Sequence, residues 1–392
     1  MWRAALSGLG ACLLGIGLAR FAYTPLIPAL IEAHWFSPAA AVYFGAANLA
    51  GYLFGAIAAR SMARFLSPVV ALRAAMVVVT LSFFASADPM DWGWFFLWRF
   101  LSGFGGAVIM VVAAPTILTR VPAAKRGVVS GVIFAGIGTG VVLSGTLVPL
   151  LLRHGMVAAW LGLGALSAVL TAASWQGWPR QSARAGDDVA GARPSAFVWF
   201  DFAIGALLIE YTLLALALVP CMVFLVDYIA RGLGLGIARG GLYWAVYGVG
   251  AIIGPLVLGR LSDRLGFRAM VRVSFAVIAL AVAALMVTRA AAPLFLASFV
   301  VGAVTPGTVP VFVGRTQEMV LDPDHRQAIW AAATTCFALG LTVASYAYSF
   351  VFAASGGDYR LLFGFGVGAA LLALAIDLVV PLVHRRGRLR AV

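Results

Sequence analysis

The chain has 392 residues and a formal net charge of +13, and 63% of its residues are hydrophobic while only 10% are charged. Soluble domains carry about 25% charged residues, so this chain cannot cover a water-exposed surface with polar groups and is predicted to be a membrane protein. Its basic residues stand in short patches between apolar runs and form no basic stripe with interleaved aromatic residues, which excludes a nucleic-acid-binding protein.

Twelve apolar stretches follow one another, and each is long enough to cross a bilayer, which takes about 20 residues. The first is too long for the core of a signal peptide, so we expect it to be kept as a helix. The predicted helices cover residues 5–31, 39–62, 68–87, 92–119, 127–152, 156–176, 197–225, 239–261, 268–288, 293–314, 326–353 and 359–383. The longest polar stretch, 177–196, predicts a cytoplasmic linker between an N-terminal six-helix bundle at 1–176 and a C-terminal bundle at 197–392.

The distribution of Lys and Arg predicts the orientation of these helices. Twenty basic residues flank them on the side of the N-terminus, whereas five flank them on the other side, namely Arg153, Arg231, Arg239, Arg289 and Arg360. Because cytoplasmic loops carry the excess of Lys and Arg in membrane proteins, both termini are predicted to be cytoplasmic.

The sequence also repeats itself, because two similar segments end the second and the eighth predicted helices. Residues 259–268 read Gly-Arg-Leu-Ser-Asp-Arg-Leu-Gly-Phe-Arg, and residues 55–64 are their weaker counterpart at an offset of 204. Arg126 and Arg326 open helices five and eleven in the same way. Two six-helix repeats around a central cavity are typical of secondary transporters, so the predicted fold class is an all-α membrane protein of twelve transmembrane helices with that architecture.

Residues 259–268 resemble the loop motif of the major facilitator superfamily, Gly-x-x-x-Asp-Arg-x-Gly-x-Arg. The resemblance implies that this loop gates the cytoplasmic side of a transporter through Asp263, Arg264 and Arg268. Asp263 would face the start of helix five and lock the two halves together, because a helix N-terminus favours a nearby anion. In the first-half counterpart Ala59 stands at the Asp position, so we expect no equivalent lock there.

Three further helices extend the resemblance. Helix four holds Arg99 followed by Gly103 and Gly105, similar to the superfamily pattern Arg-x-x-x-Gly-x-Gly, whose arginine is linked to proton coupling in relatives. Helix five has Val141 where the antiporter motif has its proline, which disfavours drug efflux. Residues 17–28 resemble a bacterial branch of the superfamily, the YbfB/YjiJ type, which implies a multi-pass protein of the bacterial inner membrane.

Among the ionisable residues of the predicted helices, three stand out deep in the membrane, where charges are costly and are interpreted first as functional. Arg20, Arg99 and Glu210 belong to helices one, four and seven, which line the central cavity in the superfamily. Counted along the helices, all three fall in one layer, slightly to the periplasmic side of the bilayer centre. We predict that they form a binding or coupling site, and the alternative is a structural ion pair such as Arg20 with Glu210.

Polar and aromatic residues near these charges complete the candidate site. The candidates are Tyr23, Thr24, Asn48, Tyr211, Tyr247, Trp330 and Tyr346. Three acidic residues are predicted to take no part in binding. Asp201 and Asp227 flank helix seven and are expected to be solvated, and Asp377 is expected to be structural, near the cytoplasmic face.

The balance of buried charge predicts the cargo. Two arginines against one glutamate favour a small organic anion, carried by alternating access, with Glu210 taking up and releasing the coupling proton. One alternative is efflux of an amphipathic or drug-like compound by proton antiport, because the cavity-facing helices are otherwise apolar. Another is a membrane receptor or assembly factor that keeps the fold without transport.

An enzyme is not predicted, because the sequence offers no nucleophile–base pair. A metal or other cofactor is not predicted either, since Cys12, Cys221 and Cys336 are far apart and no histidines repeat at i,i+4. The expected partners are a small-molecule substrate, protons and the lipid bilayer, and the chain is expected to act as a monomer.

Overall fold

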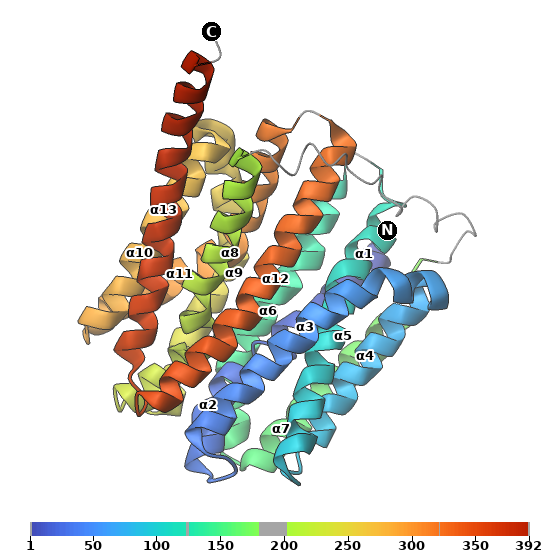
Figure 1. Cartoon of the computed structure of the whole chain (residues 1–392). Helices are drawn as coiled ribbons and strands as arrows, with labels where there is room; N and C mark the ends of the chain where they lie inside the picture. The colour runs from blue at the N-terminus through green and yellow to red at the C-terminus, as the bar shows by residue number, and fades with distance from the viewer. Residues whose placement is uncertain (1, 123–124, 180–201, 321, 391–392) are drawn as a thin grey trace.

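The computed structural model describes residues 2–122, 125–179, 202–320 and 322–390, and all regular structure in this part of the chain is helical (Figure 1). The first half consists of α1 (Trp2–Cys12), η1 (Leu13–Leu18), α2 (Tyr23–Glu32), α3 (Pro38–Leu66), α4 (Pro68–Ala85), α5 (Trp92–Leu118), α6 (Arg126–Leu152) and α7 (Met156–Ser174). The second half consists of α8 (Phe202–Asp227), η4 (Tyr228–Gly232), α9 (Ile237–Leu265), α10 (Phe267–Val287), α11 (Ala291–Met319), α12 (Pro323–Ala354) and α13 (Tyr359–Arg390).

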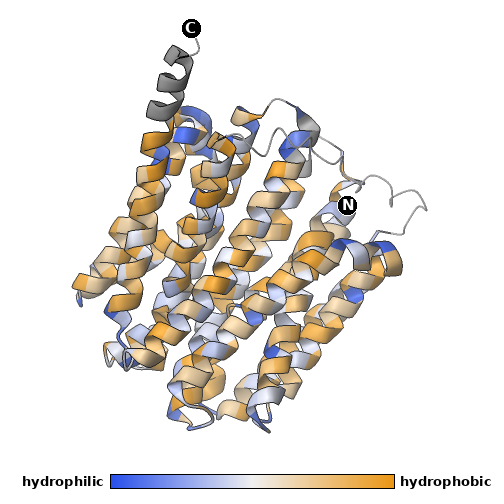
Figure 2. Ribbon diagram, in the orientation of Figure 1, coloured by the Kyte–Doolittle hydropathy of each residue, from blue (hydrophilic) through white to orange (hydrophobic). Residues whose placement is uncertain are grey.

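Twelve spans among the described residues are long and apolar enough to cross a membrane, which confirms the predicted number. Hydrophobic residues cover the helix surfaces, and hydrophilic residues collect at the two ends of the bundle (Figure 2). The start of α1 and the end of α13 lie at one end, which we call the terminal face, and we call the opposite end the far face (Figure 1). Most of the predicted linker, 180–196, lies outside the described residues, so the domain boundaries stay a prediction.

The two halves repeat the same helix packing. α3 packs on α5, α4 on α5 and α7, and α1 on α6, and in the second half α9 packs on α11, α10 on α11 and α13, and α8 on α12. Gly51 and Gly103 allow the backbones of α3 and α5 to approach closely, and Gly250 and Gly302 do the same for α9 and α11, each 199 positions later. The second repeat therefore reproduces the first in structural detail.

The first span is a discontinuous helix. It changes at Leu13 to a π-helical segment and then passes through a turn before α2 begins. Pro25 has no backbone N–H and excludes the carbonyl four residues before it, which leaves the carbonyl oxygen of Phe21 without its helical partner. Trp244 of the second half donates its Nε1–H to this oxygen at 3.2 Å, so the break in the helix becomes a contact between the halves.

The seventh span extends beyond its predicted end at 225, because the π-helical segment η4 continues it to Gly232. Asp227, which we expected to be solvated, is instead fully buried. Its carboxylate pairs with Arg231, with a distance of 2.5 Å to Nε, and accepts a hydrogen bond from the Tyr359 hydroxyl at 2.6 Å. An i,i+4 ion pair compensates the buried charge, so the aspartate does not end the helix. Asp201 lies outside the described residues.

The halves contact each other from the middle of the bundle to the far face. Gly138 and Gly145 of α6 lie directly against the backbone of α9, where a side chain on either glycine would collide. About two helical turns nearer the terminal face, Gly131 on α6 and Gly259 on α9 face open space. The two helices therefore diverge, and the halves are joined at the far face and apart at the terminal face.

Candidate functional site

Arg99 lies on α5, deep between the helices of the first half, and only 2% of its surface is exposed. Its Nη1 donates to the carbonyl oxygen of Ala19 at 3.1 Å, in the turn that interrupts the first span. The guanidinium carbon lies 4.2 Å from the centroid of the Tyr23 ring, a cation–π contact. Nε and Nη2 are buried and have no hydrogen-bond partner among the described residues. Two of its nitrogens are therefore free to bind an anion.

Arg20 stands in the same turn and is partly exposed. Its guanidinium carbon lies 5.3 Å from the Tyr52 ring centroid and 5.5 Å from that of Phe21. Its Nη2 is buried without a hydrogen-bond partner among the described residues. Aromatic faces contact both arginines, and neither pairs with a carboxylate in the part of the chain that the structure describes, so their positive charges remain available to a ligand.

Asn48 holds the framework around the arginines together. Its Nδ2 donates to Ser102 Oγ at 2.7 Å and to the carbonyl oxygens of Ala19 and Arg99 at 3.3 Å each. Because the amide joins three segments, it fixes the turn that carries Arg20 against α5. Ser102 is a site residue that sequence reasoning missed, although it follows Arg99 at the i+3 spacing of helical neighbours.

One small cavity brings five of the predicted residues together. Its lining includes Arg20, Tyr23, Thr24, Asn48 and Arg99 of the first half and Met222 and Val223 of the second. Thr24 Oγ1 donates to the carbonyl oxygen of Met222 at 2.8 Å and so closes the cavity between the halves. The cavity measures about 20 Å³, room for about one water molecule. A ligand larger than water therefore requires the halves to separate here.

Glu210 does not belong to this cavity. It is buried on α8, and its charged neighbours are Asp377, Arg315, Arg268 and Arg272, which lie towards the terminal face. The prediction of one layer for all three charges is wrong, because Glu210 lies nearer the terminal face than the two arginines. The Arg20–Glu210 ion pair is also absent from the described residues in this conformation.

The other aromatic candidates fall into separate groups. Tyr211 packs against Trp330, with ring centroids 5.6 Å apart, and also against Phe312 and Phe337. Tyr247 stacks on Trp244 and donates its hydroxyl to Thr305 Oγ1 at 2.8 Å. The lining of the arginine cavity does not include these three predicted residues in this conformation, although Tyr247 is an electrostatic neighbour of Arg20.

Tyr346 contacts the first half rather than the arginine cavity. Its ring lies 6.2 Å from that of Tyr43 on α3. Tyr52, which the sequence reasoning missed, instead covers Arg20. Its position one helical turn after Asn48 is the signal that would have found it.

The predicted gating residues lie at the terminal face. Asp263 and Arg264 are exposed at the end of α9. Arg268 is turned into its own half, with its Nε 3.8 Å from Asp377 Oδ1, and Arg272 pairs with the other oxygen of that carboxylate. Asp377 thus ties α10 to α13 near the terminal face. With the halves apart at this face, the predicted lock by Asp263 is not engaged.

The chain matches known proteins over almost its whole length. The family model described as an uncharacterised MFS-type transporter, YbfB, matches residues 12–380. The chain belongs to this family. The YbfB-type chain is therefore a membrane transporter of the major facilitator superfamily and not an enzyme, as the motifs predicted.

Solved structures confirm the fold of this YbfB-type transporter. The crystal structure of a D-xylose-proton symporter matches with a TM-score of 0.71 and 15% identity, covering 94% of this chain and 96% of that chain. The crystal structure of the nucleoside transporter NupG matches with a TM-score of 0.78 and 15% identity, covering 96% of this chain and 98% of that chain. At this identity the likeness concerns the fold alone. No curated protein matches the chain.

Proposed function

We propose that this transporter carries a small organic anion, bound between the halves by Arg20 and Arg99. The observation that carries the proposal is the pair of guanidinium groups with buried, unpartnered nitrogens at one cavity. Arginine stays charged inside a membrane and binds carboxylate or phosphate through paired hydrogen bonds. Since the described residues that line the cavity include two arginines and no acidic residue, the site carries about two positive charges and favours a substrate with two negative ones.

Alternating access is the mechanism that fits a site of this size. The cavity is too small for an organic anion while the far face is closed, so substrate enters from the terminal face as contacts such as Thr24 to Met222 loosen. Closure of the terminal face and opening of the far face would then expose the same arginines to the other side. Only a relative movement of the two halves is required.

We also propose that a proton drives transport through Glu210. Burial favours the neutral form of a carboxyl group, whereas a nearby arginine favours its charged form. Arg268 and Arg315 are within electrostatic reach of Glu210, and Arg268 belongs to the gating loop. If closure of the terminal face moves this loop, the proton affinity of Glu210 changes with conformation, which couples the proton to the cycle. This replaces Arg20 as the partner expected from the sequence.

A binding screen tests the nature of the substrate. Purified protein would be heated with dicarboxylates, phosphate monoesters and monocarboxylates, each beside its uncharged amide or ester. A ligand at about 100 times its Kd stabilises the folded state by about 2.7 kcal/mol, a clear rise in Tm. We expect doubly charged anions to give the largest rises. Hits confined to neutral or cationic amphipathic compounds would instead support drug efflux.

We propose that the terminal face is cytoplasmic and that the chain resides in a bacterial inner membrane, as the bias of Lys and Arg predicts. Single cysteines would replace Phe65 at the terminal face and Met90 at the far face, which are 88% and 64% exposed, in a variant without native cysteines. In intact cells, an impermeant maleimide should label the cysteine at 90 and not the one at 65. The reverse pattern would invert the topology.

The lock by Asp263 is tested by the variant Asp263→Asn. A carboxylate at a helix N-terminus contributes about 0.3–1 kcal/mol, so losing it should shift the equilibrium about two- to fivefold towards the state open at the terminal face. Spin labels at positions 65 and 265, one in each half, would report longer distances. An unchanged distance distribution, with substrate bound and without it, would remove Asp263 from the gate.

A further inference from the structure

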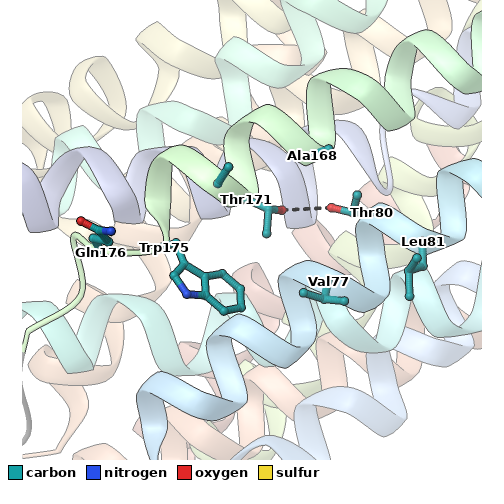
Figure 3. Close-up of a pocket in the computed structure, with 8 residues that line it drawn as sticks. Val77, Thr80, Leu81, Ala168, Thr171, Trp175 and Gln176 are labelled. Carbon is teal, nitrogen blue, oxygen red and sulfur yellow. Dashed lines mark hydrogen bonds between the residues drawn. The ribbon is translucent and has the colours of Figure 1, made fainter.

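A groove lies on the outer side of the first half, between α4 and α7 (Figure 3). Its volume of about 460 Å³ is within the range of pockets that hold small ligands. Both helices pack against other helices of the first half, and the groove is separate from the arginine cavity between the halves. Its lining residues Val77, Leu81 and Ala172 are exposed and none of its lining belongs to the arginine cavity, so the groove faces the membrane and lies outside the proposed transport pathway.

The walls of the groove suit a hydrocarbon chain. Val77 and Leu81 of α4 face Ala172 of α7, and all three are exposed. The two polar residues between them, Thr80 and Thr171, are hydrogen-bonded to each other at 3.0 Å (Figure 3). Since Thr80 also donates to a carbonyl of its own helix, these hydroxyls are satisfied without a polar ligand. In a bilayer, the apolar group that reaches this surface is an acyl chain.

Arg73 marks the terminal-face end of the groove, one helical turn before Val77. Its Nε and Nη2 donate to the carbonyl oxygen of Trp175 at 3.2 and 2.7 Å, and its guanidinium carbon lies 4.8 Å from the indole ring. These contacts hold the side chain in place, and Arg73 forms no ion pair with a carboxylate among the described residues. The acidic residues within 1–179 are Glu32, Asp88 and Asp91, and all belong to the far face.

In the second half, the arginine that corresponds to Arg73 is neutralised by a carboxylate. Ser67 and Gly266, 199 positions apart, precede α4 and α10 with matching backbone angles, φ 74° and ψ 146° against φ 84° and ψ 146°. In this register Arg73 corresponds to Arg272, whose guanidinium pairs with Asp377 of α13. At the corresponding place the described residues of the first half form a groove and provide no carboxylate. An external anion would complete the pattern.

We propose that the groove binds one anionic glycerophospholipid, with an acyl chain between α4 and α7 and its phosphate at Arg73. The phosphate takes the place that Asp377 occupies in the second half, and Trp175 anchors the boundary between chain and headgroup. Basic pockets between transmembrane helices are suited to anionic headgroups. The bound lipid would brace the outer side of the first half while the two halves move.

Native mass spectrometry of the full-length protein tests this site, with phosphatidylglycerol and zwitterionic phosphatidylcholine as probes. We expect one phosphatidylglycerol to bind more tightly than any phosphatidylcholine. Arg73→Gln should weaken that binding about fivefold, the effect of about one basic residue at an anionic surface. Arg64→Gln, at an exposed arginine of the same face, should leave it unchanged. Equal loss in the two variants would reduce the effect to general surface charge and overturn the proposal.

A second pair of variants tests the groove itself. Ala172→Leu adds bulk within the groove, whereas Ala173→Leu adds the same bulk at the exposed neighbouring residue outside it. Bound phosphatidylglycerol should decrease only in the first variant, with Tm unchanged in both. Retention of the lipid by Ala172→Leu would contradict a lipid site. So would a dimer that forms without lipid and that Ala172→Leu disrupts, because a second copy of the chain would then occupy the groove.

Discussion

Replacing either central arginine with lysine should weaken substrate binding by about 10- to 100-fold although the charge is conserved. Hydrogen bonds to charged groups contribute about 1.5–3 kcal/mol each, and the ammonium group of lysine cannot reproduce the planar, paired geometry of a guanidinium. For Arg99 the effect should be the larger, because its two free nitrogens are buried and its position over Tyr23 is fixed. Isothermal titration with the best anion from the binding screen measures the change.

The matched control for these variants is Arg64→Lys, at an exposed arginine far from the cavity, which should bind the anion normally. A melting curve for each variant separates loss of binding from loss of folding, since Arg99 also holds the turn at Ala19. Normal affinity in both Arg20→Lys and Arg99→Lys would refute the anion site.

Replacing Glu210 with glutamine should abolish accumulation driven by a pH gradient while substrate exchange continues. The amide mimics the protonated acid throughout the cycle, so no proton is taken up or released when the neighbouring arginines move. Because Glu210 forms no ion pair with Arg20, the substitution leaves no orphaned partner there, and we expect little loss of stability. Uptake into proteoliposomes, with and without an imposed pH gradient, separates the two activities.

Glu32→Gln is the control for this experiment, because Glu32 is exposed at the far-face end of α2 and forms no ion pair among the described residues. It should keep both exchange and accumulation. A Glu210→Gln protein that still concentrates the anion against its gradient would show that another group carries the proton.

The sequence was sufficient for the spans because their length and apolar character are local properties. The error at the end of the seventh span has a local cause, the ion pair from Asp227 to Arg231, which keeps a charged segment helical. The strongest evidence of the repeat was missed. The chain has 44 glycines, so the sequence does not single out Gly51 and Gly250, or Gly103 and Gly302, as pairs. Only their matching close contacts make them equivalent.

The candidate site could be predicted where helical spacing and the superfamily resemblance both apply. Tyr23 and Thr24 follow Arg20 within one turn, and the resemblance brings helix four to helix one, so Arg99 joins them. Glu210 could not be placed, because its depth depends on how far helix seven slides along its neighbours. That register is set by tertiary packing, including the contact at Pro220 of α8, where the carbonyl of Leu216 lacks its helical partner and accepts from the Tyr348 hydroxyl.

Solute counterflow in proteoliposomes tests most directly whether an organic anion passes through the arginine cavity. Vesicles with purified protein would be loaded with the unlabelled anion and diluted into a trace of the labelled one. We expect labelled anion to accumulate transiently inside vesicles with the wild-type protein and not inside vesicles with Arg99→Lys. Equal accumulation in both would contradict the account, and so would wild-type protein that binds the anion without counterflow.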